Sequence, residues 1–422
     1  MAEHDRELPL EPPSLQGAEW LERAETSAVF DALAGEGVET RAVGGAVRNS
    51  LLKLPVAEVD LATTVVPPTV MALAAKAGLK AVPTGIDHGT VTVIASGVPF
   101  EVTTLRRDVE TFGRHARIAF TEDWEEDARR RDFTLNALYA DRHGTVFDPL
   151  GGFADLKAGR VRFIGDPEER IKEDYLRILR FFRFNAYYGK GPLDPAGLAA
   201  SVRLREGLAH LSAERVGAEL RRILVAPQAA GAIAALYDYG LLTSLLGGVP
   251  RLADFARLIE IDTALGLAPD AALRLASLAV FVREDVARLG ERLRLANAEQ
   301  AVLALAADDA LDRGLPEEGS AQAALYRLGA SAYRSTLRIA WARSGACADD
   351  PRWRLALALP ERWQAPVFPL RGADIMALGD LKGPEIGAIL RRLEQDWIAQ
   401  GFAEDREALL AKAAKLARLS ER

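Results

Sequence analysis

Hydrophobic and polar positions follow two different patterns along this 422-residue chain. From about residue 39 to residue 164, short runs rich in β-branched residues alternate with helical patterns, which predicts a mixed sheet with interspersed helices. Ser96 and Gly97 separate two of the runs and predict a tight hairpin. Strands are expected at 39–43, 57–63, 88–95, 99–106, 146–149 and 161–164, and helices at 18–35, 46–53 and 67–78.

Beyond about residue 165 the strand signals stop. Leucine, alanine and arginine dominate, and apolar residues recur at spacings of three and four, which predicts a series of amphipathic helices up to residue 422. Pro227, the pair Gly247-Gly248 and residues 360–369 are the expected joints. The chain is therefore expected to carry an α/β module that does chemistry, followed by helical modules that hold a large substrate.

Composition narrows the class of protein. Hydrophobic residues make up 49% and charged residues 27%, as in a packed globular protein, and the net charge of −7 argues against a protein that coats nucleic acid through bulk charge. The single cysteine, Cys347, excludes an intrachain disulfide. No secretory signal or long apolar span is evident, so a cytoplasmic protein with no membrane segment is expected. Because no histidine follows His210, chemistry based on histidine is not expected in the C-terminal half.

A glycine turn followed by two carboxylates suggests phosphate chemistry. Gly44 and Gly45 close the strand at 39–43 and open a helix, so the backbone can approach a phosphate, and Arg48 adds a cation one turn later. Glu58 and Asp60 lie two residues apart on an expected strand, so both side chains would face one side and offer paired oxygens to Mg²⁺. Each part alone is more often structural, as a tight turn or a solvated strand edge.

Two further segments carry polar groups in suggestive patterns. Arg130 and Arg131 could neutralise a triphosphate, and Asp132 and Asn136 suit ribose hydroxyls, although such clusters are more often solvated helix faces. On a helix expected at 171–185, the polar residues Asp174, Arg177 and Arg180 lie opposite an apolar stripe, with Arg183 further round.

The Asp–Arg pair on this helix matches the pattern that cytosine and adenine share. A carboxylate accepts from the exocyclic amino group and an arginine donates to the neighbouring ring nitrogen, whereas uracil and guanine reverse both polarities. Asp174 with Arg177 could therefore select C and A without a nucleic-acid template. The alternative is a surface helix with ordinary charge pairs.

Together these segments resemble the class II tRNA nucleotidyltransferase and bacterial poly(A) polymerase family, within the polymerase β-like nucleotidyltransferase superfamily. The resemblance rests on Gly-Gly-Ala-Val-Arg at 44–48 with Glu58-x-Asp60, Arg-Arg-Asp-Phe-Thr-Leu-Asn-Ala at 130–137, Asp-Pro-Leu-Gly-Gly at 148–152, and Glu-Asp-x-x-Arg-x-x-Arg at 173–180. The family usually has Asp-x-Asp, so Glu58 is a departure that leaves its ligand geometry less certain than that of Asp60.

The resemblance implies an α+β multidomain fold. A polymerase β-like nucleotidyltransferase head with a mixed sheet would span residues 20–164. It would be followed by an all-helical neck at 165–228 with the nucleotide-template helix, a helical body at 229–350 and a helical, tRNA-binding tail at 351–422.

The resemblance also implies site residues. Glu58 and Asp60 would bind two Mg²⁺ ions, and Glu101 would be a third catalytic carboxylate, unless it is an exposed strand acid. Residues 106–115 resemble a flexible loop, and residues 213–220 a helix start that frames the pocket. Nucleotide-binding residues would be Gly44, Gly45, Arg48, Arg131, Asp132, Asn136, Asp174, Arg177, Arg180 and Arg183; tail contacts to tRNA phosphates would be Arg371, Lys382, Arg391 and Arg392.

The function that the resemblance implies is template-independent addition of CCA to the 3′ end of tRNA, with CTP and ATP as substrates and pyrophosphate released. A poly(A) polymerase, or an enzyme that adds only CC or only A, stays open as an alternative, although the lack of a basic run at the C-terminus favours the tRNA enzyme. The alternative from another class is a catalytically inactive RNA-binding protein, which only Glu58 supports. The oligomeric state stays undetermined.

Overall fold

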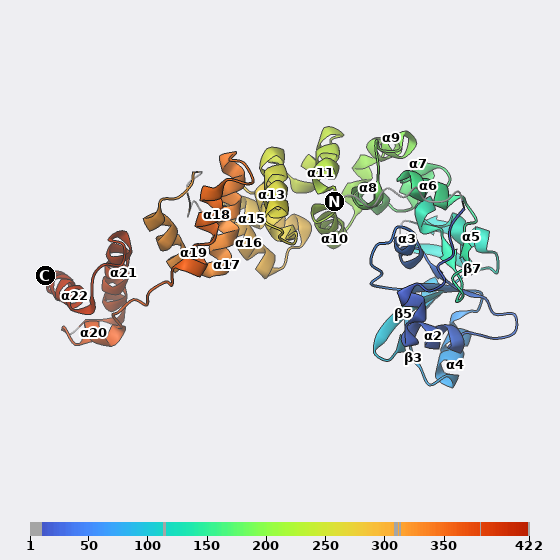
Figure 1. Ribbon diagram of the computed structural model, residues 1–422, viewed down its shortest axis with the longest axis horizontal. Helices are drawn as coiled ribbons and strands as arrows, with labels where there is room; N and C mark the ends of the chain where they lie inside the picture. Colours follow the sequence, from blue (N-terminus) through green and yellow to red (C-terminus); the bar gives the residue numbers. More distant parts are fainter. Residues whose placement is uncertain (1–10, 113–114, 308–310, 312–313, 380, 421–422) are drawn as a thin grey trace. The chain divides into compact units, whose positions relative to one another are not determined.

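The computed structural model describes residues 11–420 except 113–114, 308–310, 312–313 and 380. It divides the chain into two compact units, Met1–Leu241 and Leu242–Arg422 (Figure 1). The expected division into head, neck, body and tail is finer than this and stays a prediction.

The first unit is built on a seven-stranded mixed sheet with the order β3-β4-β5-β2-β1-β8-β9. The β2–β5 pair is parallel and every other neighbouring pair is antiparallel. Strands β6 (Arg106–Phe112) and β7 (His115–Phe120) form a separate hairpin. The sheet strands are β1 (Thr40–Val43), β2 (Asp60–Thr63), β3 (Lys80–Gly85), β4 (Thr90–Ala95), β5 (Val98–Thr104), β8 (Tyr139–Ala140) and β9 (Val146–Phe147).

Buried residues alternate with partly buried residues along β4, so one face of this strand lies in the core. Val91, Val93 and Ala95 are buried, and helices α2 and α4 pack on this part of the sheet. The predicted β4–β5 hairpin is confirmed, and both turn residues, Ser96 and Gly97, have positive φ as a tight hairpin requires. The helices of this part are α1 (Glu19–Glu22), α2 (Ala24–Ala32), α3 (Gly45–Leu51), α4 (Pro67–Lys76), α5 (Trp124–Arg129) and α6 (Gly152–Ala158), with 3₁₀ turns η1 (Ile86–His88) and η2 (Thr134–Asn136).

Several predicted elements differ from the structure. The helix expected at 18–35 is interrupted at Arg23, which is extended and separates α1 from α2. Residues 161–164 form no strand, only an isolated bridge between Phe133 and Phe163. Four strands were not predicted, namely β3, β6, β7 and β8. The segment expected as a flexible loop falls largely within the β6–β7 hairpin, and its residues 113–114 lie outside the described residues.

The helix predicted at 171–185 is also wrong, because it is two helices. Helix α7 (Pro167–Glu173) ends before Asp174, which is extended, and α8 (Leu176–Tyr188) begins two residues later. The Asp174 carboxylate accepts the backbone N–H of Leu176 at 3.1 Å. A short acidic side chain that bonds a backbone N–H in this way favours a helix start over a helix interior. The unit continues through α9 (Pro195–Arg203), η3 (Arg205–His210), α10 (Ala213–Leu224) and α11 (Ala229–Asp238).

The second unit is helical throughout its described residues, as predicted. In its centre Trp341 and Trp353 are buried and stack with ring centroids 5.8 Å apart. Its helices are α12 (Leu242–Leu246), α13 (Leu252–Ala264), α14 (Ala271–Ala279), α15 (Glu284–Leu293), α16 (Asn297–Ala307), α17 (Glu318–Ser344), α18 (Pro351–Leu357), α19 (Leu359–Arg362), α20 (Gly372–Met376), α21 (Gly383–Ala399) and α22 (Arg406–Ser420).

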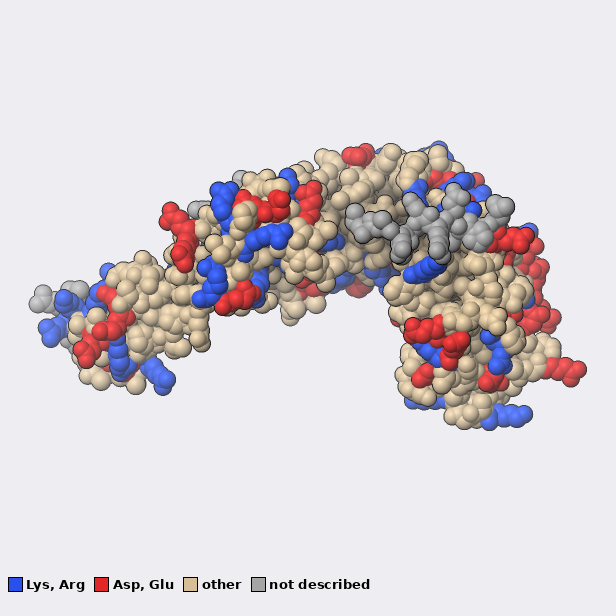
Figure 2. All heavy atoms as spheres, in the orientation of Figure 1, with Lys and Arg blue, Asp and Glu red and all other residues tan. Residues whose placement is uncertain are grey.

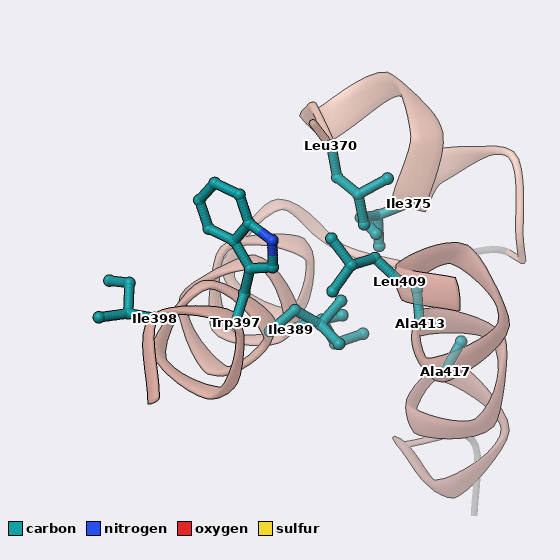
Figure 3. Packing of buried hydrophobic residues seen from close by; sticks show 9 residues of the cluster. Leu370, Ile375, Ile389, Trp397, Ile398, Leu409, Ala413 and Ala417 are labelled. Atoms are coloured by element: carbon teal, nitrogen blue, oxygen red, sulfur yellow. The ribbon is translucent and has the colours of Figure 1, made fainter. Parts of the chain in front are cut away.

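The last three helices share a small apolar core. Ile389 and Trp397 of α21 pack toward Leu409 and Ala413 of α22, with Ile375 of α20 beside them (Figure 3). The two motifs that resemble the family's tail begin helices here, because Asp374 and Glu385 each accept a backbone N–H at 2.7 Å, three residues before them. The expected phosphate contacts Arg371, Lys382, Arg391 and Arg392 are all exposed, and their role stays a prediction.

Surface charge is mixed on the face that Figure 2 shows, where basic and acidic side chains are interspersed. Among the helices of the described residues, none is long and apolar enough to cross a lipid bilayer.

A glycine at the start of α6 allows a close backbone approach in the head. A Cβ on Gly152 would lie 2.1 Å from the backbone oxygen of Thr134, whereas a Cβ on Gly151 would meet nothing within 4 Å. We expect Gly152→Ala to lower the free energy of unfolding of the first unit by about 3 kcal/mol, because the Thr134 backbone must move. Chemical denaturation followed by circular dichroism measures this.

The neighbouring glycine provides the control. Gly151 has φ of +67°, so Gly151→Ala should cost only about 1 kcal/mol, from the left-handed backbone alone. Equal losses in the two variants would contradict the steric explanation.

Candidate active site

A glycine turn positions the first wall of a cavity. Strand β1 ends at Val43, and Gly44 turns the chain into α3 with φ of 68° and ψ of −110°, a conformation that favours glycine. The Gly44 N–H donates to the carbonyl of Leu138 at 3.0 Å, which fixes the turn against the segment that precedes β8.

The cavity has a volume of about 400 Å³ and collects most of the predicted nucleotide-binding residues. More arginines than carboxylates line it, which suits a polyphosphate ligand. The lining residues with charged side chains are Arg48, Arg130, Arg131, Arg177, Arg180, Arg215, Asp60, Asp132 and Asp174; the others are Val43, Gly44, Gly45, Asn136, Leu176 and Phe184.

Arg48 is largely engaged by the protein itself. It is buried, donates from Nη2 to the Tyr188 hydroxyl at 2.8 Å, and also binds the side-chain oxygens of Asn49 and Asn136. Its guanidinium carbon lies 4.2 Å from the centre of the Tyr188 ring. Arg48 therefore joins α3 to α8. Its positive charge acts on the cavity, but its N–H donors are largely bound within the protein.

Asp132 is a buried carboxylate shared between the head and the first long helix that follows it. Arg180 of α8 donates to it from both Nε, at 2.8 Å, and Nη2, and the Asn136 side chain donates to it at 2.8 Å. Burial alone would raise the pKa of Asp132, but the Arg180 charge and the hydrogen bonds from Asn136 and Arg180 hold it well below its usual range. The carboxylate is thus an ionised acceptor at neutral pH.

Asp127 holds the two arginines that precede Asp132. Arg130 binds one oxygen of Asp127 and Arg131 the other, while the Tyr139 hydroxyl also donates to Asp127 at 2.8 Å. Burial opposes ionisation, but the charges of Arg131 and Arg130 lower the pKa of Asp127 to about 2. This fully buried acid fixes how both guanidiniums present themselves to the cavity.

Three carboxylates, Glu58, Asp60 and Glu101, gather where the interior strand β2 begins, and this place is called the carboxylate edge. Asp60 begins β2, and the parallel register that pairs Leu61 with Val102 brings Asp60 beside Glu101 of β5. Partial burial, then the charges of Glu101 and Glu58, raise the pKa of Asp60 to about 6. Glu58 precedes β2, so the expectation that Glu58 and Asp60 share a strand is wrong, although the two charges still influence one another.

The donor set at this edge fits a divalent cation. Glu58 and Glu101 are exposed, and a cation bound here would offset the repulsion that their charges exert on the partly buried Asp60 carboxylate. Among the described residues, no group of three or more histidine, cysteine, aspartate and glutamate side chains forms a cage for a metal ion. Mg²⁺ commonly needs no such cage, since one or two carboxylates bind it together with substrate phosphates and water.

Asp174 and Arg177, the predicted base-selecting pair, both face the cavity but do not bind one another. Arg215 donates to Oδ2 of Asp174 at 2.7 Å. Arg177 uses Nη1 to bind Glu173 and the backbone oxygen of Arg170, and among the described residues its Nε and Nη2 have no partner. The pair therefore presents an anchored acceptor beside an arginine with free donors.

Comparison with known proteins gives a consistent result. Residues 40–162 match the family described as poly A polymerase head domain, and residues 192–255 match a probable RNA- and SrmB-binding site of polymerase A. The mitochondrial CCA tRNA nucleotidyltransferase 1 of Mus musculus is 36% identical over 385 residues, which cover 90% of this chain and 87% of the relative. The human counterpart is 34% identical over 89% of this chain and 86% of the relative.

The chain belongs to the CCA tRNA nucleotidyltransferase family. A solved structure of the Bacillus stearothermophilus CCA-adding enzyme in complex with CTP is 27% identical, covers 94% of this chain and 98% of its own, and has a TM-score of 0.72. A Thermotoga maritima CCA-adding enzyme complexed with tRNA, with 18% identity and a TM-score of 0.63, shares the fold.

Family membership agrees with how the predicted residues are placed. Ten of them line the cavity, namely Gly44, Gly45, Arg48, Asp60, Arg131, Asp132, Asn136, Asp174, Arg177 and Arg180. Glu58 and Glu101 do not line it but lie near Asp60. Arg183 does not line it either, because its Nε binds the buried Glu219 of α10 at 2.6 Å. The binding role of each residue stays a prediction.

Four further contributors were not predicted from the sequence as site residues. Asp127 precedes Arg130 and Arg131 by three and four residues, a helical spacing that predicts ion pairs and could have identified it. Phe184 and Tyr188 read in the sequence as ordinary apolar positions of α8. Arg215 lies in the segment that was assigned to framing the pocket, and no local pattern links it to Asp174, 41 residues earlier.

The Asp132–Arg180 pair leads to a pH-dependent prediction. Removing the guanidinium in Arg180→Met leaves a buried carboxylate without its cation, which should cost about 3 kcal/mol of unfolding free energy at pH 8. Without Arg180, burial should raise the pKa of Asp132 above that of the unfolded chain, so the variant regains stability as the pH falls. The gap from the wild type should therefore narrow at pH 5, measured by chemical denaturation.

The wild-type contribution from Asp132 hardly changes over this range, because its depressed pKa in the folded chain and its ordinary pKa of 3.8 in the unfolded chain both lie below pH 5. Arg129→Met, which removes an exposed pair with Glu125, is the control and should show a small, pH-independent loss. A gap for Arg180→Met that is equal at both pH values would contradict the assignment.

Proposed function

We propose that this protein adds CCA to the 3′ end of tRNA without a nucleic-acid template, using CTP and ATP and releasing pyrophosphate. The observation that carries the proposal is one cavity in which the head carboxylate Asp60 and the base-selecting pair Asp174 and Arg177 lie together. Relatives that are 36% and 34% identical over most of the chain are CCA tRNA nucleotidyltransferases, which supports it further.

Base choice follows from the polarity of the pair. Asp174 accepts a hydrogen bond from the amino group of cytosine or adenine, and Arg177 donates from Nε or Nη2 to the adjacent ring nitrogen. Uracil and guanine would place a carbonyl against the carboxylate and an N–H against the guanidinium. A buried or half-buried site that leaves two such groups unpaired rejects a ligand strongly.

The remaining residues hold the nucleotide's sugar and phosphates. Arg131 and Arg48 supply positive charge near the glycine turn, and the Asp132–Asn136 pair suits the ribose hydroxyls. Arg180 acts mainly through Asp132, because both of its bonds go to that carboxylate. This division leaves the triphosphate beside Asp60.

The transfer step takes place at the carboxylate edge of the sheet. Two Mg²⁺ ions held by Asp60 and Glu58, when bound, would lower the pKa of the attacking 3′-hydroxyl and neutralise the leaving pyrophosphate. The tRNA 3′-oxygen bonds to the α-phosphorus as the bond to the bridging oxygen of pyrophosphate breaks. Glu101, beside Asp60, is the proposed acceptor of the hydroxyl proton.

We propose a cytoplasmic location, which the single cysteine supports because one thiol needs no oxidising compartment. Two of the relatives are named as mitochondrial enzymes. Fractionation of the source cells with an antibody against the protein separates the two locations.

The first test uses tRNA that lacks CCA, with Mg²⁺ and with CTP, ATP or both, resolved at single-nucleotide length. We expect CC with CTP alone and one further A when both nucleotides are present. A long A ladder would favour a poly(A) polymerase, which the matched family of residues 40–162 keeps open as an alternative. Addition of only CC or only A would indicate a split specificity, and no extension would favour an inactive RNA-binding protein.

Metal dependence provides the second test. Chelation by EDTA, and separately Asp60→Asn, should each lower CCA addition by at least about 1,000-fold, because electrostatic stabilisation of the transferring phosphoryl group is lost. Glu58→Asp should keep activity within about tenfold, since either carboxylate offers an oxygen ligand.

Glu125→Gln, an exposed acid on α5 outside the cavity, is the control for loss of one negative charge and should leave activity unchanged. Full activity of Asp60→Asn in Mg²⁺ would contradict the assigned metal site. Activity that appears only in Glu58→Asp would show that the natural glutamate has inactivated the enzyme.

A further inference from the structure

Asp174 lies in extended conformation between α7 and α8 and lines the cavity, so the position of its side chain needs an explanation. One oxygen of its carboxylate accepts the N–H of Leu176 at the start of α8, whereas no bond from α7 or α8 holds the other oxygen. A short side chain on an extended residue can rotate, and a rotating acceptor discriminates poorly between hydrogen-bond patterns. Something outside this junction must fix it.

Arg215 holds one oxygen of the Asp174 carboxylate in place. It lies in the first turn of α10, 41 residues after Asp174, and its Nη2 donates to Oδ2 at 2.7 Å while the Leu176 N–H donates to Oδ1 at 3.1 Å. Both carboxylate oxygens are thereby bonded, and each keeps a lone pair for a ligand. Both side chains are about one quarter exposed and both line the cavity, so the pair lies where a base would meet it.

The same segment also holds the backbone beside Asp174. A Cβ on Gly207 would lie 1.9 Å from the ring of Tyr175, so this ring rests directly on the backbone of η3. His210 lies on the same short helix, η3, and the centre of its ring is 6.0 Å from the centre of the Tyr175 ring. The segment 205–215 therefore contacts the junction twice, through the Tyr175 ring and through the Asp174 carboxylate.

The framework behind Arg215 is rigid. Val216, Leu220, Ile223 and Leu224 form a buried stripe along α10, which packs on α8. Arg215 is next to the first residue of this stripe, so burial of Val216 sets where the guanidinium lies. An arginine fork on a fixed helix directs a carboxylate more narrowly than a flexible cation would.

We propose that Arg215 is a specificity-determining positioning residue that orients Asp174 toward the exocyclic amino group of the incoming base, an inference that rests on the proposed function. Among the described residues, Arg215 pairs with Asp174 and with none of Glu58, Asp60 and Glu101. Its removal should weaken the discrimination for amino-bearing bases more than it weakens catalysis.

The test couples Arg215 to the amino group itself. Single-turnover kcat/KM is measured for CTP and for the triphosphate of pyrimidin-2-one riboside, which lacks the amino group, on tRNA lacking CCA. In the wild type, kcat/KM for the analogue should be at least about 100-fold lower than kcat/KM for CTP, and this ratio is the amino-group cost. In Arg215→Met the ratio should be smaller by about tenfold or more. Arg215→Lys, which keeps a cation, should give an intermediate cost.

Arg203→Met is the matched control. Arg203 forms an ion pair with Glu168 at 2.6 Å elsewhere in the same helical region and does not line the cavity, so its loss should leave the amino-group cost unchanged. Thermal unfolding of each variant identifies any that fails to fold. Should Arg215→Met not fold, Gly207→Ala replaces it, since displacement of Tyr175 should also reduce the cost.

The outcomes separate the two levels of the argument. If Arg215→Met lowers kcat/KM equally for CTP and for the analogue, the arginine serves phosphate binding or stability and the proposal is wrong. If the wild type adds CC and A but shows no cost for the missing amino group, the function stands and the role of Arg215 falls. If the wild type adds no nucleotide, the proposed function fails first.

Discussion

The pairing of Asp132 with Arg180 is the interaction on which the site depends. It joins a buried carboxylate of the sheet module to α8, the first long helix that follows it, and Asn136 completes the contact. The cavity has walls from both parts, so this pair helps to hold the carboxylate edge and the predicted base-selecting residues at a fixed separation. Removing one partner of a buried ion pair costs more unfolding free energy than the intact pair contributes relative to apolar packing. Single substitutions at this junction are therefore poorly tolerated.

The rest of the cavity extends this pair into a network. Asn136 binds both Asp132 and Arg48, and Arg48 in turn binds Tyr188 of α8, so the two parts meet at two points of the same helix. Phe184 lies between these points, and the guanidinium carbons of Arg48, Arg180 and Arg183 all approach its ring within 5.5 Å. Aromatic faces attract cations, so this ring adds to the carboxylates Asp132 and Glu219 in offsetting the repulsion among the three like charges.

Local spacing predicted the order of the sheet module and the helices and the glycine turn, whereas the resemblance to a known family implied that most of the cavity residues belong to one site. The hairpin at Ser96-Gly97 and the helical character of the second unit were predicted for the same reason. The patterns failed where distant segments decide the outcome. Phe163 bridges Phe133 without forming a strand, and Asp174 leaves the helical pattern because its carboxylate bonds Leu176 and Arg215. The Asp174–Leu176 bond is local, but no local spacing predicts the Phe133–Phe163 bridge or the Asp174–Arg215 bond.

The helix break at Asp174 has a consequence for the accuracy of the enzyme. Because the extended residue Asp174 links α7 to α8, its backbone angles depend on how α7 packs on α9 and how α8 packs on α10. On the proposed function, buried positions such as Ile178 and Leu220 thereby influence the error rate although they do not line the cavity. Selection for faithful tRNA ends would then act on the hydrophobic interior of this region as well as on the cavity, and variants with normal turnover could still produce miscoded termini.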